Sequence, residues 1–138
     1  MAAESRSVQN RRLLRARDTM DRAYADALDI ESLADSVHLS RAHFIRSFKE
    51  TFGETPHRYL QRRRIERAMR MLRETDEDVT GISIEVGFRS LGTFSRTFRD
   101  IVGVSPSEYR EREQAAPKAA IRAGVPGCFA AKWDRPRN

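Results

Sequence analysis

Two arginine residues with matching neighbours have the chemistry to bind a polyanion. Arg46 stands between Phe44 and Phe48, and fifty positions later Arg96 stands between another two phenylalanines. A guanidinium group donates two parallel hydrogen bonds to a phosphate or to the O6 and N7 atoms of guanine. Phenylalanines four residues apart share one face of a helix, and that face is expected to be buried. The pattern therefore indicates two helices that each bury a phenylalanine pair and expose an arginine.

The charge balance favours the same kind of partner. The chain has 138 residues, with 26 Lys and Arg against 20 Asp and Glu, which gives a net charge of +6. Such an excess is typical of proteins that bind nucleic acid or an anionic membrane face, and composition does not choose between the two. Arginine outnumbers lysine 23 to 3, but a GC-rich coding sequence would produce the same bias. The net charge is therefore the stronger indication.

Cysteine content and hydropathy indicate a cytoplasmic protein. Cys128 is the single cysteine, so an internal disulfide is impossible and a reducing compartment fits. No stretch reaches the roughly 18 apolar residues of a membrane span. The amino-terminal residues are charged and lack the apolar segment of a signal peptide. We therefore expect no membrane partner.

The spacing of apolar residues predicts an all-α fold of about seven helices. Glycine and proline are sparse from Val8 to Arg112, and runs of β-branched residues are absent. Ser40 is a suitable N-cap, and Gly53 and Gly103 are suitable helix ends. The helices are expected at about residues 8–28, 30–37, 41–52, 56–74, 79–86, 90–102 and from 106 onward.

The chain contains an internal repeat. A shift of 50 positions superposes six identical residues, namely Phe44 on Phe94, Arg46 on Arg96, Phe48 on Phe98, Gly53 on Gly103, Pro56 on Pro106 and Tyr59 on Tyr109. Upstream the shift becomes 49, and the one-residue difference falls in the turn between two short helices. Each copy has the plan of a helix-turn-helix unit, whose second helix enters the DNA major groove. A helical solenoid is the alternative, but solenoids usually need three or more repeats.

One long helix is expected to join the two units. Residues 56–74 would form a rod of about 28 Å at 1.5 Å per residue. Two units that read one face of DNA should sit about 34 Å apart, and such a rod can set that spacing. We therefore assign residues 8–112 to a tandem helix-turn-helix domain. Residues 113–138 are expected to form a linker-like tail, with Phe129 and Trp133 as a possible apolar docking segment.

These residues resemble the DNA-binding domain of the AraC-type (AraC/XylS) bacterial transcription regulators. The resemblance runs from about residue 28 to 110. In the first unit it rests on Leu33, Ala34, Ser40, Phe44, Arg46, Phe48, Lys49, Gly53, Thr55, Pro56, Tyr59, Leu60, Arg64 and Ile65. In the second it rests on Ile82, Val86, Gly87, Phe88, Ser90, Phe94, Arg96, Phe98, Gly103, Ser105, Pro106, Tyr109 and Arg110.

The family pattern has departures in both units. Ser83 replaces a usual alanine, and His38 stands where glycine is common in the turn. Gly92 and Thr93 replace a more usual polar–aromatic pair, which puts the base preference of the second unit in doubt.

The resemblance implies double-stranded DNA as the partner and a role in bacterial transcription. It further implies recruitment of RNA polymerase by an activator, although a repressor would need only an overlapping site. The chain looks like the stand-alone, MarA-like form, without a small-molecule effector domain. That form implies a monomer, nucleoid-associated when bound.

Candidate DNA contacts follow from the position of each residue on or beside the second helix of its unit, and for Arg62 and Arg63 from the run of arginines at 62–64. The residues expected to read base edges are Arg41, Ala42, Ile45, Arg46, Leu91, Gly92, Ser95 and Arg96. The residues expected to bind phosphate are Ser40, Lys49, Arg62, Arg63, Arg89, Ser90, Thr93 and Arg99. His43 is expected to be exposed to solvent.

Other functions fit the sequence less well. No nucleophile–base pair, phosphate-binding loop or paired carboxylates are recognisable, so we expect no enzyme and no cofactor. His38, His43 and His57 lack the spacing of metal ligands, so no metal is expected. A protein-binding adaptor that keeps the fold without DNA binding remains the main alternative.

Overall fold

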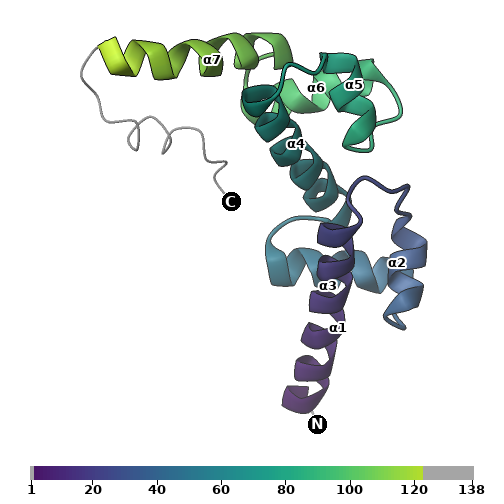
Figure 1. The fold of residues 1–138 in the computed structure, drawn as a ribbon. Coiled ribbons are helices and arrows are strands. Elements are labelled where there is room, and N and C mark those ends of the chain that lie inside the picture. The colour runs from purple at the N-terminus through teal and green to yellow at the C-terminus, as the bar shows by residue number, and fades with distance from the viewer. Residues whose placement is uncertain (1, 123–138) are drawn as a thin grey trace. The chain divides into compact units, whose positions relative to one another are not determined.

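The computed structural model describes residues 2–122, and the side chains of residues 6–115, as an assembly of helices (Figure 1). Seven helices occupy this described part, as the sequence predicts. They are α1 (Ala2–Arg22), α2 (Ile30–Ser36), α3 (Arg41–Phe52), α4 (Pro56–Glu74), α5 (Val79–Glu85), α6 (Leu91–Val102) and α7 (Pro106–Arg122). The chain divides inside α4 into two compact units, unit 1 up to Arg64 and unit 2 from Ile65.

The helices α3 and α6 begin and end as the sequence predicts. The Ser40 hydroxyl accepts a hydrogen bond from the His43 amide at 3.2 Å, and Ser90 caps α6 in the same way. Gly53 and Gly103 end the two helices with φ angles of 82° and 96°, in the left-handed region that favours glycine. Helices α3 and α6, the second helices of the two helix-turn-helix pairs, therefore have the same length and the same caps.

Both predicted bounds of the first helix are wrong. Helix α1 begins at Ala2 instead of residue 8 and ends at Arg22 instead of residue 28, and a turn follows. Helix α7 continues to Arg122, beyond residue 112. The residues just past that point, Glu113, Gln114 and Ala115, are good helix formers, so the segment expected to be linker-like is helical as far as Arg122. Phe129, Trp133 and Cys128 lie outside the described residues.

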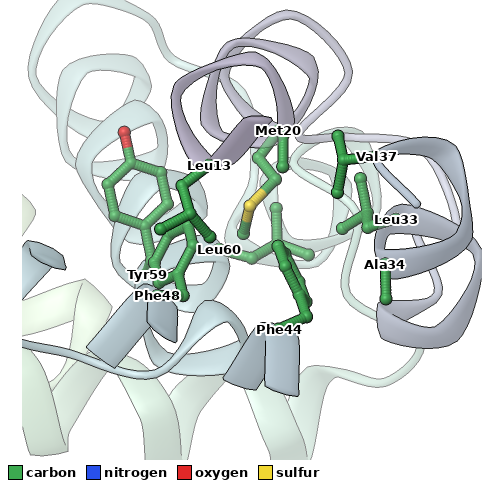
Figure 2. Packing of buried hydrophobic residues seen from close by; sticks show 10 residues of the cluster. Leu13, Met20, Leu33, Ala34, Val37, Phe44, Phe48, Tyr59 and Leu60 are labelled. Carbon is green, nitrogen blue, oxygen red and sulfur yellow. The ribbon is translucent and has the colours of Figure 1, made fainter. Parts of the chain in front are cut away.

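The core of unit 1 is built around the first phenylalanine pair (Figure 2). Phe44 and Phe48 are fully buried, with ring centroids 5.7 Å apart, and Phe48 meets the Tyr59 ring at 5.6 Å. Other core side chains come from α1, α4, and α2 with the residue that follows it, namely Leu13, Ala16, Met20, Leu33, Ala34, Val37 and Leu60. The predicted inward orientation of this pair is confirmed.

Unit 2 repeats this packing with the second phenylalanine pair. Phe94 and Phe98 are fully buried, with ring centroids 5.8 Å apart, and Phe98 meets the Tyr109 ring at 5.6 Å. Phe88 adds a further ring, 5.3 Å from Phe94. The internal repeat in the sequence is therefore also a repeat of side-chain packing within each unit.

An arginine in each unit holds the loop that precedes the first helix of the helix-turn-helix pair, α2 in unit 1 and α5 in unit 2. Arg64 donates to the carbonyl oxygens of Tyr24 at 2.6 Å and Asp26 at 2.8 Å. Arg110 donates to the carbonyl oxygen of Leu72 at 3.2 Å and to that of a loop residue, Thr75, at 3.3 Å. The hydrogen bonds of Arg64 therefore hold the loop between α1 and α2 against α4. Burial lowers the pKa of Arg64.

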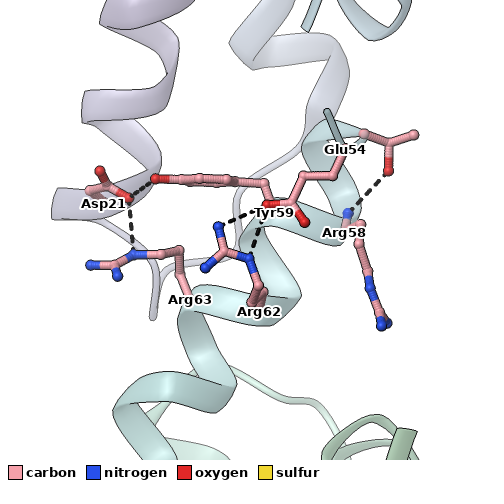
Figure 3. A network of polar contacts seen from close by, with 7 residues as sticks. Asp21, Glu54, Arg58, Tyr59, Arg62 and Arg63 are labelled. Atoms are coloured by element: carbon pink, nitrogen blue, oxygen red, sulfur yellow. Dashed lines mark hydrogen bonds and ion pairs between the residues drawn. The ribbon is translucent and has the colours of Figure 1, made fainter. Parts of the chain in front are cut away.

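A polar contact joins α1 to α4 in unit 1 (Figure 3). The Tyr59 hydroxyl donates to Asp21 at 2.7 Å, and Arg63 forms an ion pair with the same carboxylate at 3.2 Å. Burial, followed by the hydrogen bond to Asp21, raises the pKa of Tyr59 from 10.0 to about 12. Both effects disfavour the phenolate, so this contact requires a protonated tyrosine.

Gly53→Ala and Gly92→Ala should change stability in opposite directions. An alanine at 53 meets no neighbour within 4 Å but must adopt a positive φ, which should cost about 1–2 kcal/mol. An alanine at 92 also meets no neighbour, and it should stabilise helix α6 by up to about 1 kcal/mol. Urea unfolding of both variants measures the difference. A shift of the same sign in both would contradict the role given to the positive φ.

The stability of the protein should fall between about pH 10 and 12 through Tyr59. The folded chain holds the Tyr59 proton to a higher pH than the unfolded chain does, so the stabilisation is complete below pH 10 and is lost as the pH rises towards about 12. Urea midpoints at pH 9 and pH 11 measure this loss. Tyr59→Phe should reduce it, with the other tyrosines unchanged as internal controls. An identical loss in the variant would rule out Tyr59 as its source.

Candidate nucleic-acid interface

The predicted base-reading residues of unit 1 lie along one surface of α3. Ala42 and Arg46 are exposed and Ile45 is half-buried, while the opposite side of the helix carries the buried phenylalanines. Arg41 is exposed in the first turn, directly after the Ser40 cap. The structure therefore presents these four residues away from the core, as a groove-reading helix requires. Their contact with DNA stays a prediction.

Helix α6 of unit 2 has the same arrangement with smaller side chains. Gly92 and Arg96 are exposed, Ser95 is half-buried, and the Leu91 side chain is 42% exposed. A Cβ atom built on Gly92 meets nothing within 4 Å, so the first turn has open space beside it. The equivalent surfaces of α3 and α6 thus share an arginine but differ in polarity and bulk.

The predicted phosphate-binding residues gather at the beginning and along the edge of the same helices. The Ser40 and Ser90 hydroxyls cap their helices, and Ser90 also donates to the Thr93 hydroxyl at 3.0 Å. These caps lie at helix amino termini, where amide groups and the helix dipole favour an anion. The exposed cations of the set are Lys49 on α3, Arg89 just before α6 and Arg99 on α6.

Arg62 and Arg63 also have carboxylate partners within unit 1. Arg62 donates to the Glu54 carboxylate at 2.8 Å and lies over the Tyr59 ring, 5.3 Å from its centroid (Figure 3). Arg63 forms its ion pair with Asp21. Both guanidinium groups therefore have partners within unit 1, and their predicted contact with phosphate stays a prediction. The charge run alone could not reveal this, because Asp21 lies about forty residues earlier in the sequence.

His43 is another residue whose role the sequence did not reveal. It was expected to be exposed, but its Nε2 atom lies 2.7 Å from Gln9 Oε1 on α1 and 3.5 Å from Ser47 Oγ. Because His43 is in the first turn of α3, this contact fixes the beginning of that helix against α1. No sequence pattern indicates a partner that is 34 positions away.

The described helices also lack the apolar length of a membrane span. None of them is long and apolar enough to cross a bilayer. Exposed basic residues occur on several helices, and among them are Arg41, Arg46 and Lys49 on α3 and Arg96 and Arg99 on α6.

Comparisons with known proteins agree with this geometry. A family model described as a helix-turn-helix domain matches residues 33–112, more than half of the chain. The chain is 39% identical over 93 residues to the transcriptional activator RhaS of Escherichia fergusonii, covering 67% of this chain and 34% of that protein. It is 36% identical over 85 residues to the MmsAB operon regulatory protein of Pseudomonas aeruginosa, covering 62% and 28% respectively.

Two solved structures have a similar fold. The DNA-binding domain of AdpA, in complex with a target DNA, has a TM-score of 0.69 at 30% identity, covering 75% of this chain and 93% of that one. The carboxy-terminal domain of AraT, a response regulator from Geobacillus stearothermophilus, has a TM-score of 0.70 at 29% identity, covering 72% and 84%.

The chain spans only about a third of the length of the curated relatives that it matches. The match lies in the region that holds both helix-turn-helix units and their repeated packing. The chain belongs to the AraC-type helix-turn-helix family of transcription regulators.

Proposed function

We propose that this protein is a sequence-specific DNA-binding transcription regulator that reads two adjacent major-groove segments through α3 and α6. The observation that carries the proposal is the duplicated helix surface. In each unit a buried phenylalanine pair orients one helix so that an arginine, Arg46 or Arg96, is exposed on the side away from the core. Recognition helices of helix-turn-helix proteins enter the major groove in this way.

The base contacts differ between the two units. Arg46 and Arg96 each donate two hydrogen bonds to the O6 and N7 atoms of a guanine, a contact worth about 1–3 kcal/mol of discrimination against other bases. Ala42 and Ile45 touch thymine methyl groups in the first unit. Leu91 offers an apolar contact in the second, where Gly92 and Ser95 have little hydrogen-bonding capacity. The second unit therefore depends more on the shape of the DNA than the first.

Phosphate contacts set the orientation of each helix on the duplex. Ser40, Ser90 and Thr93 offer hydroxyl groups at the helix amino termini, and Lys49, Arg89 and Arg99 add positive charge beside them. Such contacts carry no base information but fix the register of the reading side chains.

Two relatives support the biological part of the proposal. The similar AdpA domain was solved with a target DNA, and the relative RhaS is named a transcriptional activator. We propose that this protein also activates transcription by recruiting RNA polymerase, in the bacterial cytoplasm and on the nucleoid. Two reading helices in one chain can serve as the two halves of a dimer do, so it acts as a monomer.

Selection of bound sequences from a random DNA pool tests the proposal. We expect a motif of two boxes whose centres are about ten base pairs apart, one helical turn of DNA. A single box would contradict simultaneous reading by both units. No enriched motif would contradict sequence-specific binding altogether.

Substitution of the two exposed arginines tests which side chains read the bases. Arg46→Ala and Arg96→Ala should each weaken binding to the selected site by about 1–3 kcal/mol and relax the base preference in one box only. Arg15→Ala, an exposed arginine of α1, is the charge-matched control and should leave the base preference unchanged. Fluorescence anisotropy with single-base variants of the site measures both effects. Uniform weakening across all site variants would instead make Arg46 and Arg96 phosphate contacts.

A further inference from the structure

Helix α1 is held against the recognition helix of unit 1 at two points. Gln9 Oε1 lies 2.7 Å from His43 Nε2 in the first turn of α3, and the Arg17 guanidinium lies 4.5 Å from the Phe52 ring centroid in the last turn. Between them Leu13 and Ala16 are fully buried. Helix α1 crosses α3, and its amino-terminal end continues past it (Figure 1).

Two arginines stand on either side of the Gln9 contact. Arg6 and Arg12 are three residues before and three residues after Gln9, so all three lie on neighbouring positions of one helix face. Arg6 is exposed and Arg12 is half-buried. The contact with His43 therefore brings this pair to the side of α3 at its first turn.

The charge of this part of α1 is of one sign. From Ser5 to Arg17 the chain has five arginines and no acidic residue. Among the side chains that the structure describes, no carboxylate forms an ion pair with Arg6 or Arg12. These two guanidinium groups are thus available for an anion, in contrast to Arg62 and Arg63.

The position of His43, in the first turn of α3, points to a DNA phosphate as the anion. When a recognition helix lies in the major groove, its first turn is closest to the bases and the phosphates of both strands run along the groove edges. A cation that lies beside this first turn, away from the base-reading side chains, is therefore close to the phosphates along one edge of the groove. Arginine suits a phosphodiester there, because it donates a fork of hydrogen bonds.

We propose that the amino-terminal half of α1 is an additional phosphate-binding surface, formed by Arg6 and Arg12 and positioned by the Gln9–His43 contact. It binds the DNA backbone that flanks the segment read by α3. This inference rests on the proposed function, since it needs α3 in the groove, and it adds a contact from outside both helix-turn-helix units.

Salt dependence of DNA binding tests the inference. The double variant R6Q/R12Q should lower the slope of log K against log salt by about 0.9 for each phosphate that the protein no longer neutralises, hence by about 1.8 for two phosphates. The matched control is R11Q/R22Q, which removes the same charge from two exposed positions of α1, neither of which is three or four residues from Arg6 or Arg12. The control should leave the slope within experimental error of the wild-type value. The DNA is the site selected by the full chain.

The outcomes separate this inference from the proposed function. A lower slope for R6Q/R12Q alone supports it. Equal changes in both variants, or a change in the control alone, would overturn it, because net charge or another face would then be responsible. No change in either variant, with the wild-type chain still binding its site, overturns the α1 contact and leaves the proposed function intact. If the wild-type chain binds no DNA, both proposals fail.

Discussion

Burial of two phenylalanines four residues apart sets the orientation of each recognition helix. In unit 1, Phe44 and Phe48 have no exposed surface, and rotation of α3 about its axis would bring at least one of the rings into water. Burying a side chain of this size is worth about 1.5–3 kcal/mol, so the orientation is strongly preferred. Arg46 lies midway between the two rings in sequence and therefore points outward. The surface that we propose to meet DNA is a consequence of the core behind it.

Arginine serves two different purposes in this protein. The guanidinium groups of Arg62, Arg63 and Arg64 stay within unit 1, where they bind carboxylates or backbone carbonyls. Arg46 and Arg96 are exposed on helices whose other faces are apolar. A high arginine content therefore does not measure the strength of DNA binding. What matters is whether a carboxylate or carbonyl lies within reach in the folded chain.

Local sequence signals predicted much of the structure, and long-range contacts account for what was missed. The caps at Ser40 and Ser90 and the left-handed glycines were predictable, because each depends on a few adjacent residues. The outward faces of α3 and α6 followed from helical periodicity. The hydrogen bonds of Arg64 to the loop after α1, the ion pair of Arg63 with Asp21 and the His43–Gln9 contact join residues 34 to 42 positions apart, which no periodicity reveals. The spacing of the two recognition helices remains a prediction.

The open space beside Gly92 has an evolutionary consequence. Most positions on a recognition helix are constrained because a new side chain must fit among its neighbours as well as against the ligand. At Gly92 the first of these constraints is absent, since a Cβ atom encounters nothing within 4 Å and the residue is exposed in the first turn of α6. A single codon change there can add a donor, an acceptor or a methyl group without repacking the core. Related chains with this backbone can therefore vary the side chain at this position, which we propose to face DNA, while keeping the same fold.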